Sequence, residues 1–352
     1  MTISLQPVVA VQGALRQRVI AIYTLLAVFN LGAWAWAFVA FHANPLLLST
    51  GFLAYGFGLR HAVDADHIAA IDNVTRKLMQ DGQRPVSVGF FFALGHSAVV
   101  LLVAAGLAAT AAALEHRVEA WKAFGGIIST SVSALFLFLI AAMNIVILRG
   151  VWHAFNRVRR GLPYSDDDLD LLLNNRGFLA RLFRPMFRLV SKPVWMFPLG
   201  FLFGLGFDTA TEVSLLGLSA SQASQGISIG VVLVFPVLFA AGMSLVDTTD
   251  GVLMLGAYDW AFVRPIRKLY YNLTITLVSV AVAVLIGGIE TLGLLGARFK
   301  LQGGFWDVIG ALNENFNNLG FVIIGVFIFA WVASFVVYRA KRYDDLPTYQ
   351  PD

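Results

Sequence analysis

The hydrophobic positions of this chain form long apolar runs that are separated by short polar segments. Each run has about 20 residues or more, which is the length that an α-helix needs to cross a hydrocarbon core of roughly 30 Å. To within a few residues at each boundary, the runs cover 19–41, 46–74, 86–113, 123–148, 194–219, 227–257, 269–296 and 319–338. The pattern therefore predicts an all-α polytopic membrane protein with about eight transmembrane helices.

The composition changes this picture only by excluding other classes of protein. Hydrophobic residues make up 58% of the chain and charged residues 13%, against about 25% charged residues in a soluble domain. The net charge is +4, but the basic residues flank the apolar runs and do not form a stripe on a soluble module. We therefore expect the lipid bilayer as the surroundings and no nucleic acid as a partner.

Lysine and arginine are distributed unevenly over the connections between the predicted spans. Alternate connections carry 20 basic residues on one side and 4 on the other, while Arg60 lies inside a span. The four are Arg117, Lys122, Arg298 and Lys300. Because cytoplasmic connections are the basic ones, this split predicts eight spans with both termini in the cytoplasm.

We interpret residues 1–352 as a single transmembrane domain, with 150–193 as a cytoplasmic loop between spans four and five. That loop is too short for a nucleotide-binding domain, and the sequence contains no Gly-x-x-x-x-Gly-Lys-Ser/Thr phosphate loop. The chain is therefore predicted to have no ATPase of its own, and no obligatory ATPase partner is evident.

The second predicted span contains an unusual cluster of ionisable residues. Arg60, His61, Asp64, Asp66 and His67 occupy five of eight consecutive positions in a segment that is otherwise apolar. Each charge near a bilayer centre costs about 2.5–3.5 kcal/mol on insertion scales. Such groups are tolerated where they face a cavity, pair with one another or bind an ion, so they indicate function.

On an ideal helix, His61, Asp64 and His67 fall within a sector of roughly 120°, whereas Asp66 points elsewhere. Because the sequence has no cysteine, any metal ligands must be nitrogen and oxygen atoms. Imidazole together with carboxylate suits the divalent ions from manganese to zinc. Asp66 could then hydrogen-bond a ligating ring, or bind the ion itself if the helix is broken. The alternative is a purely structural cluster in which Arg60 neutralises Asp64 or Asp66.

Three further spans carry polar residues that are candidates for the same pathway. His96 lies in the third span, Asp208 and Glu212 are spaced i, i+4 in the fifth, and Asp247 and Asp250 share a face of the sixth. The alternatives are a buried structural histidine and carboxylates that hydrogen-bond threonines of neighbouring helices. The candidate metal residues are therefore His61, Asp64, Asp66, His67, His96, Asp208, Glu212 and Asp247.

Two short echoes suggest an internal repeat. Phe57-Gly58-Leu59 in span two returns as Phe203-Gly204-Leu205 in span five, and Gly95-His96-Ser97 in span three returns as Gly242-Met243-Ser244 in span six. With eight spans, spans two and five run in opposite directions. We therefore predict an inverted repeat of spans 2–4 and 5–7, an arrangement that places a binding site near the midplane.

The segment from Arg60 to Ile68, continuing to Arg76, resembles the signature of the nickel/cobalt transporter family, especially its high-affinity nickel permeases from hydrogenase-bearing bacteria. Segments 94–100, 205–212 and 242–251 extend the resemblance, although Ala98 replaces a hydroxyl residue. The resemblance implies that His61, Asp66 and His67 are needed for transport. It also implies eight helices with cytoplasmic termini in a bacterial cytoplasmic (inner) membrane.

Together these observations predict a secondary permease that imports Ni²⁺, with Co²⁺ as a further candidate, and not an enzyme. The metal is the transported substrate, and no cofactor is expected. A ligating imidazole must be neutral, so binding should weaken below about pH 6.5. The alternatives are a divalent metal exporter and an intramembrane metalloenzyme. Few histidines lie inside the predicted spans and no His-Glu-x-x-His motif occurs, which disfavours the enzyme.

Overall fold

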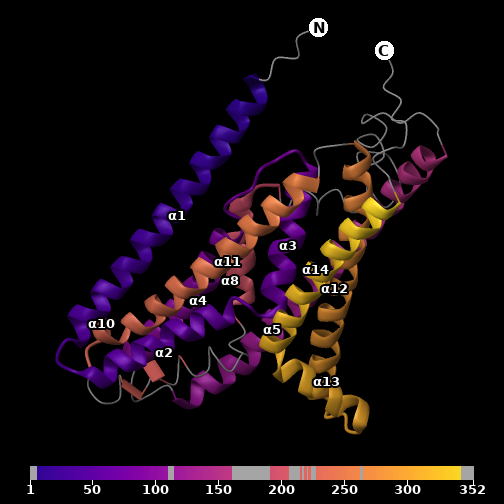
Figure 1. The fold of residues 1–352 in the computed structure, drawn as a ribbon. Helices are drawn as coiled ribbons and strands as arrows, with labels where there is room; N and C mark the ends of the chain where they lie inside the picture. Colours follow the sequence, from indigo (N-terminus) through magenta and orange to yellow (C-terminus); the bar gives the residue numbers. More distant parts are fainter. Residues whose placement is uncertain are drawn as a thin grey trace. The chain divides into compact units, whose positions relative to one another are not determined.

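A computed structural model shows that the chain is helical and contains no strand in any described residue (Figure 1). The structure describes residues 6–109, 115–160, 191–205, 215, 218–219, 221–222, 227–261 and 265–341. The helices are α1 (Gln6–Phe41), α2 (Pro45–His61), α3 (Ala65–Gln80), α4 (Val88–Ala109), α5 (Glu115–Arg159), η1 (Pro193–Trp195), α8 (Met196–Phe203), α10 (Ile229–Val232), α11 (Val234–Ala261), α12 (Pro265–Phe299), α13 (Gly304–Glu314) and α14 (Phe316–Ala340). The predicted all-α class is therefore confirmed for these residues.

Six stretches of the described helices are long and apolar enough to cross a membrane. They are Gly13–Phe41, Val88–Gly106, Gly126–Arg157, Ile229–Tyr258, Leu269–Phe299 and Asn318–Ala340. Each corresponds to one of the eight predicted spans. Of the two others, the span at 46–74 is divided between α2 and α3, and the span at 194–219 runs into residues outside the described part of the chain. The count of eight and the location of the termini stay predictions.

Helix α5 changes the expected boundary of the predicted loop at 150–193. The helix continues to Arg159, so the first ten residues of that segment are helical, while 161–190 lie outside the described residues. At 1.5 Å per residue, its 45 residues extend for about 67 Å, more than twice the thickness of a hydrocarbon core. Part of α5 must therefore project beyond the bilayer.

The α1–α2 hairpin shows why a helix begins where it does. The side chain of Asn44 accepts hydrogen bonds from the backbone N–H groups of Leu46 and Leu47, at 3.1 and 3.3 Å. Pro45 occupies the first turn of α2, where its missing N–H would have no helical partner. Polar capping and a proline thus end the connection after three residues and turn the chain back.

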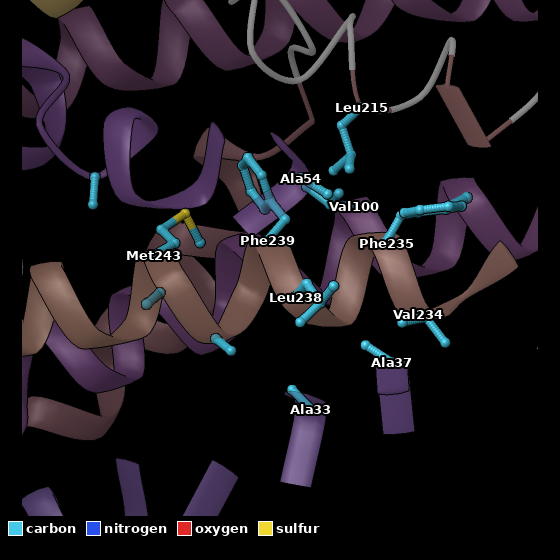
Figure 2. Packing of buried hydrophobic residues seen from close by; sticks show 14 of the residues in the cluster. Ala33, Ala37, Ala54, Val100, Leu215, Val234, Phe235, Leu238, Phe239 and Met243 are labelled. Atoms are coloured by element: carbon cyan, nitrogen blue, oxygen red, sulfur yellow. The ribbon is translucent and has the colours of Figure 1, made fainter. Parts of the chain in front are cut away.

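The chain forms two compact units. The first comprises Met1–Val63, Lys77–Ser129 and Lys192–Leu255, and the second comprises Asp64–Arg76, Thr130–Ser191 and Gly256–Asp352. In the first unit, a buried apolar cluster surrounds α11 (Figure 2). Leu238 and Val234 of α11 lie near Ala33 and Ala37 of α1, and Phe239 belongs to the same cluster. The small alanine side chains let α1 approach α11 closely.

Glycines hold two helix pairs of the first unit in close contact. A methyl group at Gly58 of α2 would overlap the backbone of Phe239 on α11, and one at Gly242 of α11 would overlap the carbonyl oxygen of Tyr55 on α2. Helices α4 and α8 meet in the same manner at Gly95 and Gly200. A larger side chain at any of these positions would force the backbones apart.

The second unit contains a buried polar network that joins α3 to α12. The carboxylate of Asp72 accepts hydrogen bonds from the hydroxyl groups of Tyr258 and Ser279. The guanidinium of Arg76, which is 1% exposed, donates to the hydroxyl of Thr276 at 2.8 Å and to the side-chain oxygen of Asn73 at 3.0 Å. These contacts compensate the cost of burying the polar face of α3.

Candidate metal centre

The predicted second span is interrupted at the ionisable cluster. Helix α2 ends at His61, and α3 begins at Ala65. The N–H of Ala62 still reaches the carbonyl of Gly58, but the N–H of Val63 turns back to that of Arg60 at 3.1 Å, which tightens the final turn. The segment predicted as a span over 46–74 is therefore not one continuous helix, because this change of hydrogen-bond pattern ends α2 before α3 begins.

The break removes the basis for the predicted 120° sector, since that sector assumes an uninterrupted helix. The helix is broken near the cluster, which is the condition under which direct binding by Asp66 was considered, and the role of Asp66 stays a prediction. The chain resumes as a helix when the N–H of Ile68 donates to the carbonyl of Asp64 at 3.2 Å. Asp64 is fully buried, and Asp66 lies half-buried in the first turn of α3.

His61 and His96 form the centre of the candidate site. Their Nε2 atoms are 3.0 Å apart, their ring centroids are 4.8 Å apart, and the side chains are 2% and 3% exposed. The hydrogen bond requires one ring to donate and the other to accept. Two nitrogen ligands that bind one metal at about 2.0–2.1 Å and at a right angle are about 2.9 Å apart. The observed separation therefore also suits two ligands of a single ion.

His67 adds a third imidazole to this pair. One ring nitrogen from each of His61, His67 and His96 lies within 4.8 Å of the other two, and all three side chains are buried. His67 follows His61 by six residues, so the short connection between α2 and α3 brings both histidines to the same place. The backbone N–H of His67 donates to the carboxylate of Asp66 at 3.0 Å, which fixes that carboxylate at the start of α3.

The chemistry of this cluster fits a divalent transition metal. Three neutral imidazoles supply nitrogen ligands, which iron, cobalt, nickel, copper and zinc accept, whereas magnesium and calcium prefer oxygen. Buried imidazoles with apolar neighbours exclude competing water. The ring of Phe239 lies against His61 with centroids 5.5 Å apart, and the ring of Phe92 lies 6.4 Å from that of His96. The site therefore has nitrogen donors inside an aromatic wall.

The remaining predicted site residues are placed differently. Asp247 is fully buried on α11, and its backbone carbonyl lies directly against Gly89 of α4. It is not a member of the histidine cluster found among the described residues. Asp208 and Glu212 lie outside the described residues, so their predicted roles stay predictions.

Sequence reasoning did not identify the two phenylalanines that line the histidine pair. Phenylalanine is common in apolar spans, and nothing in the local sequence distinguishes Phe92 or Phe239 from the other residues of this type. The one available signal was position, because Phe92 precedes His96 by one helical turn.

Comparison with known proteins gives consistent results over most of the chain. The sequence profile of a family described as "High-affinity nickel-transport protein" matches residues 47–337. A relative from Cupriavidus necator, named "High-affinity nickel transport protein", is 60% identical over 333 residues, which cover 95% of each chain. No solved structure matches significantly.

Two further relatives carry names that refer to the metal. "Hydrogenase nickel incorporation protein HupN" from Bradyrhizobium diazoefficiens is 56% identical over 88% of this chain and 81% of its own. "Cobalt transport protein NhlF" from Rhodococcus rhodochrous is 40% identical over 86% of this chain and 88% of its own.

Proposed function

The chain belongs to the high-affinity nickel-transport family, and from this premise we propose that it is a secondary permease that imports Ni²⁺ across the bacterial cytoplasmic (inner) membrane. The observation that carries the proposal is the buried pair of His61 and His96, whose Nε2 atoms are 3.0 Å apart. A separation that suits two ligands of one ion explains why imidazoles are retained in an apolar environment. The transport activity of the family favours this reading over an intramembrane enzyme.

The charge of the ion and the membrane potential favour inward transport. A membrane potential that is negative inside favours inward movement of a dication by about 4.6 kcal/mol per 100 mV if both charges cross the full field. The name of the Bradyrhizobium relative, which refers to nickel incorporation, also fits supply to the cytoplasm. Cobalt is a second candidate substrate, because imidazole binds both ions and one relative is named a cobalt transporter.

We infer eight spans with both termini in the cytoplasm. The six candidate spans become eight when the divided α2–α3 segment and the segment that begins at Pro193 are added. The packing of α4 against α8 supports this topology. Gly200 contacts Phe92, and four residues later Gly204 contacts His96, which is also four residues after Phe92. Because residue numbers increase together along both helices, α4 and α8 run in the same direction. In a topology of eight spans, the third and the fifth span also run in the same direction.

The same contacts support an inverted repeat. Gly58 lies against the backbone of Phe239, and Gly200 lies against the same three backbone atoms of Phe92. Gly242 meets a carbonyl and the N–H four residues later on α2, and Gly95 meets the equivalent pair of atoms on α8.

Each contact position on α2 has its counterpart on α8, 142 residues later in the sequence. The equivalent positions are 55 and 197, 58 and 200, 59 and 201, and 61 and 203. Phe239 packs on His61 at 5.5 Å, and Phe92 packs on Phe203 at 5.3 Å. This equivalence differs by one helical turn from the one suggested by the Phe-Gly-Leu echo.

The repeat gives the proposed mechanism a physical basis. Two halves of similar structure and opposite direction can exchange their conformations, which exposes a central site first to one side and then to the other. His61 and His96 correspond to Phe203 and Met243 in the second half. The ion-binding histidines therefore belong to one half only, and the second half supplies an apolar counterpart.

The proposal is tested by uptake of radioactive nickel into liposomes that contain the purified protein, with a potential imposed across the membrane. We expect uptake by the wild type that increases with a negative interior, and a strong loss for His61→Ala. His42→Ala is the matched control, because His42 is exposed at the end of α1. Uptake by His61→Ala at the wild-type rate would remove the site assignment, and the absence of uptake by the wild type would remove the proposed permease function.

A further inference from the structure

A cavity of about 730 Å³ opens in the first unit, and its described lining residues do not include the histidines of the cluster. Its volume lies within the range of roughly 300–1,000 Å³ that is typical of small-molecule sites. It is lined by residues of α1, the α3–α4 connection, the start of α4 and the start of η1. They are Arg18, Ala21, Ile22, Leu25, Gly82, Gln83, Arg84, Pro85, Val86, Ser87, Phe90, Phe91 and Pro193.

The lining has two chemically different parts. Arg18 and Arg84 supply two positive charges, Gln83 and Ser87 supply further hydrogen-bond donors, and none of the described lining residues is acidic. The rest of the wall is mainly apolar, with aliphatic side chains from α1 and the rings of Phe90 and Phe91 from α4. A ligand that fills this space must therefore carry an anionic group next to an apolar portion.

The cavity lies where the polar connection meets the apolar spans. Ile22 and Leu25 belong to the candidate span Gly13–Phe41, and Phe90 and Phe91 belong to Val88–Gly106. Helix α1 is largely exposed, since only 17% of its most apolar window is buried and Leu25 is 50% exposed. In a membrane these exposed surfaces contact lipid. Arg18 and Arg84 both belong to the basic set on the predicted cytoplasmic side.

We propose that this cavity binds an anionic phospholipid of the cytoplasmic leaflet. Its phosphate lies between Arg18 and Arg84, and the beginning of an acyl chain follows Ile22, Leu25 and Phe90 toward the bilayer interior. Basic pockets between transmembrane helices on the cytoplasmic side are suited to such headgroups. A small soluble anion would satisfy the arginines but would leave the apolar walls in contact with water, so the lipid is the better fit.

A lipid bound here would connect α1 to the helix that carries His96. Helix α1 has a largely lipid-exposed surface, and one of its polar contacts to the rest of the unit is the hydroxyl of Tyr23, which donates to Thr249 at 3.1 Å. A headgroup held by one arginine from α1 and one from the connection before α4 adds a further polar link to those made by Tyr23 and Asn30. The lipid would thus help to hold α1 in place in the unit.

The test counts lipids that remain bound to the purified protein in native mass spectrometry. The protein is incubated with phosphatidylglycerol, with phosphatidylcholine, or with phosphatidylglycerol and millimolar inorganic phosphate. We expect the double variant Arg18→Gln/Arg84→Gln to retain one phosphatidylglycerol fewer than the wild type. Ala21→Trp, which places a large ring in the cavity next to the arginines and keeps both charges, should lose the same lipid.

Arg16→Gln is the matched control, because Arg16 is exposed on the same helix and does not line the cavity. It should retain phosphatidylglycerol like the wild type, and phosphate should not displace the lipid. Equal lipid counts in all four proteins, equal retention of phosphatidylcholine, or displacement by phosphate would each overturn the proposal. No arm uses nickel, so the result is independent of the proposed transport function.

Discussion

Replacement of His96 by methionine separates a metal site from a merely structural pair of histidines. Met243 occupies the corresponding position in the second half of the chain and is fully buried there. A methionine side chain is therefore compatible with this environment, and His96→Met should preserve the packing around α4. It removes one nitrogen whose distance to the Nε2 atom of His61 is 3.0 Å.

The expected magnitude follows from what metal sites lose when their ligands change. Loss of a group that only orients a ligand typically weakens metal binding 10–100-fold. Loss of a ligand itself should reach at least the upper value, so we expect the Kd for Ni²⁺ to rise about 100-fold, or about 2.7 kcal/mol. If the two histidines only hydrogen-bond each other, the variant should instead lose about 1 kcal/mol of stability and bind nickel normally.

The assay is isothermal titration of purified protein in detergent with Ni²⁺, combined with thermal unfolding of the same samples. His42→Met controls for the loss of a histidine elsewhere. A Kd for His96→Met within threefold of the wild-type value, together with a lower unfolding temperature, would refute the assignment of His96 as a ligand. Weakened binding is the expected pattern, and a small decrease in unfolding temperature from the lost His61–His96 hydrogen bond is compatible with it.

Three further outcomes follow from the structure. Protons compete with the metal for neutral imidazoles, so the Kd for Ni²⁺ should rise as the pH falls through the range in which histidine titrates. Calorimetry in two buffers of different ionisation enthalpy measures the protons released on binding. Arg76 lies one helical turn after Asp72 on α3 and interacts electrostatically with its buried carboxylate. Arg76→Met removes this cation and should cost about 3–5 kcal/mol in chemical denaturation, while a second change of Asp72 to leucine should recover part of the loss; additive losses would contradict the interaction. Gly58→Ala and Gly200→Ala should each lower the free energy of unfolding by about 1–3 kcal/mol, because the added methyl group overpacks an equivalent helix contact. Gly56→Ala is the control and should be neutral, since no atom lies within 4 Å of its added methyl group. Unequal losses for Gly58→Ala and Gly200→Ala would argue against the repeat.

The sequence predicted the helical class well, because long apolar runs have few other stable solutions in a membrane. It left open a break near the ionisable cluster but did not locate the one between α2 and α3. Ala62 and Val63 continue the apolar run, and neither glycine nor proline marks the interruption. The hydropathy pattern therefore gives no sign of this connection, whereas the backbone hydrogen bonds of the structure show it.

The sequence grouped two of the three clustered histidines where these are neighbours in the chain, while their role as ligands stays a prediction. His61 and His67 could be assigned to one cluster because six residues separate them. His96 was a candidate because it is a histidine in an apolar span. Its position beside His61 depends on close helix packing, which no local sequence pattern encodes. The same limit explains Asp247, which looked equivalent by type but is not part of the histidine cluster.

The end of α2 at His61 also has an electrostatic consequence for turnover. The last turn of a helix carries roughly half a negative charge on its carbonyl groups, so a cation at this terminus is stabilised by dipoles as well as by neutral imidazoles. The cluster found among the described residues contains histidines and no carboxylate, and dipoles attract a dication less strongly than several full carboxylate charges would. A permease must release what it captures, and conduction requires binding that is weak enough to leave. A helix terminus at the proposed ion site therefore suits rapid release as much as capture.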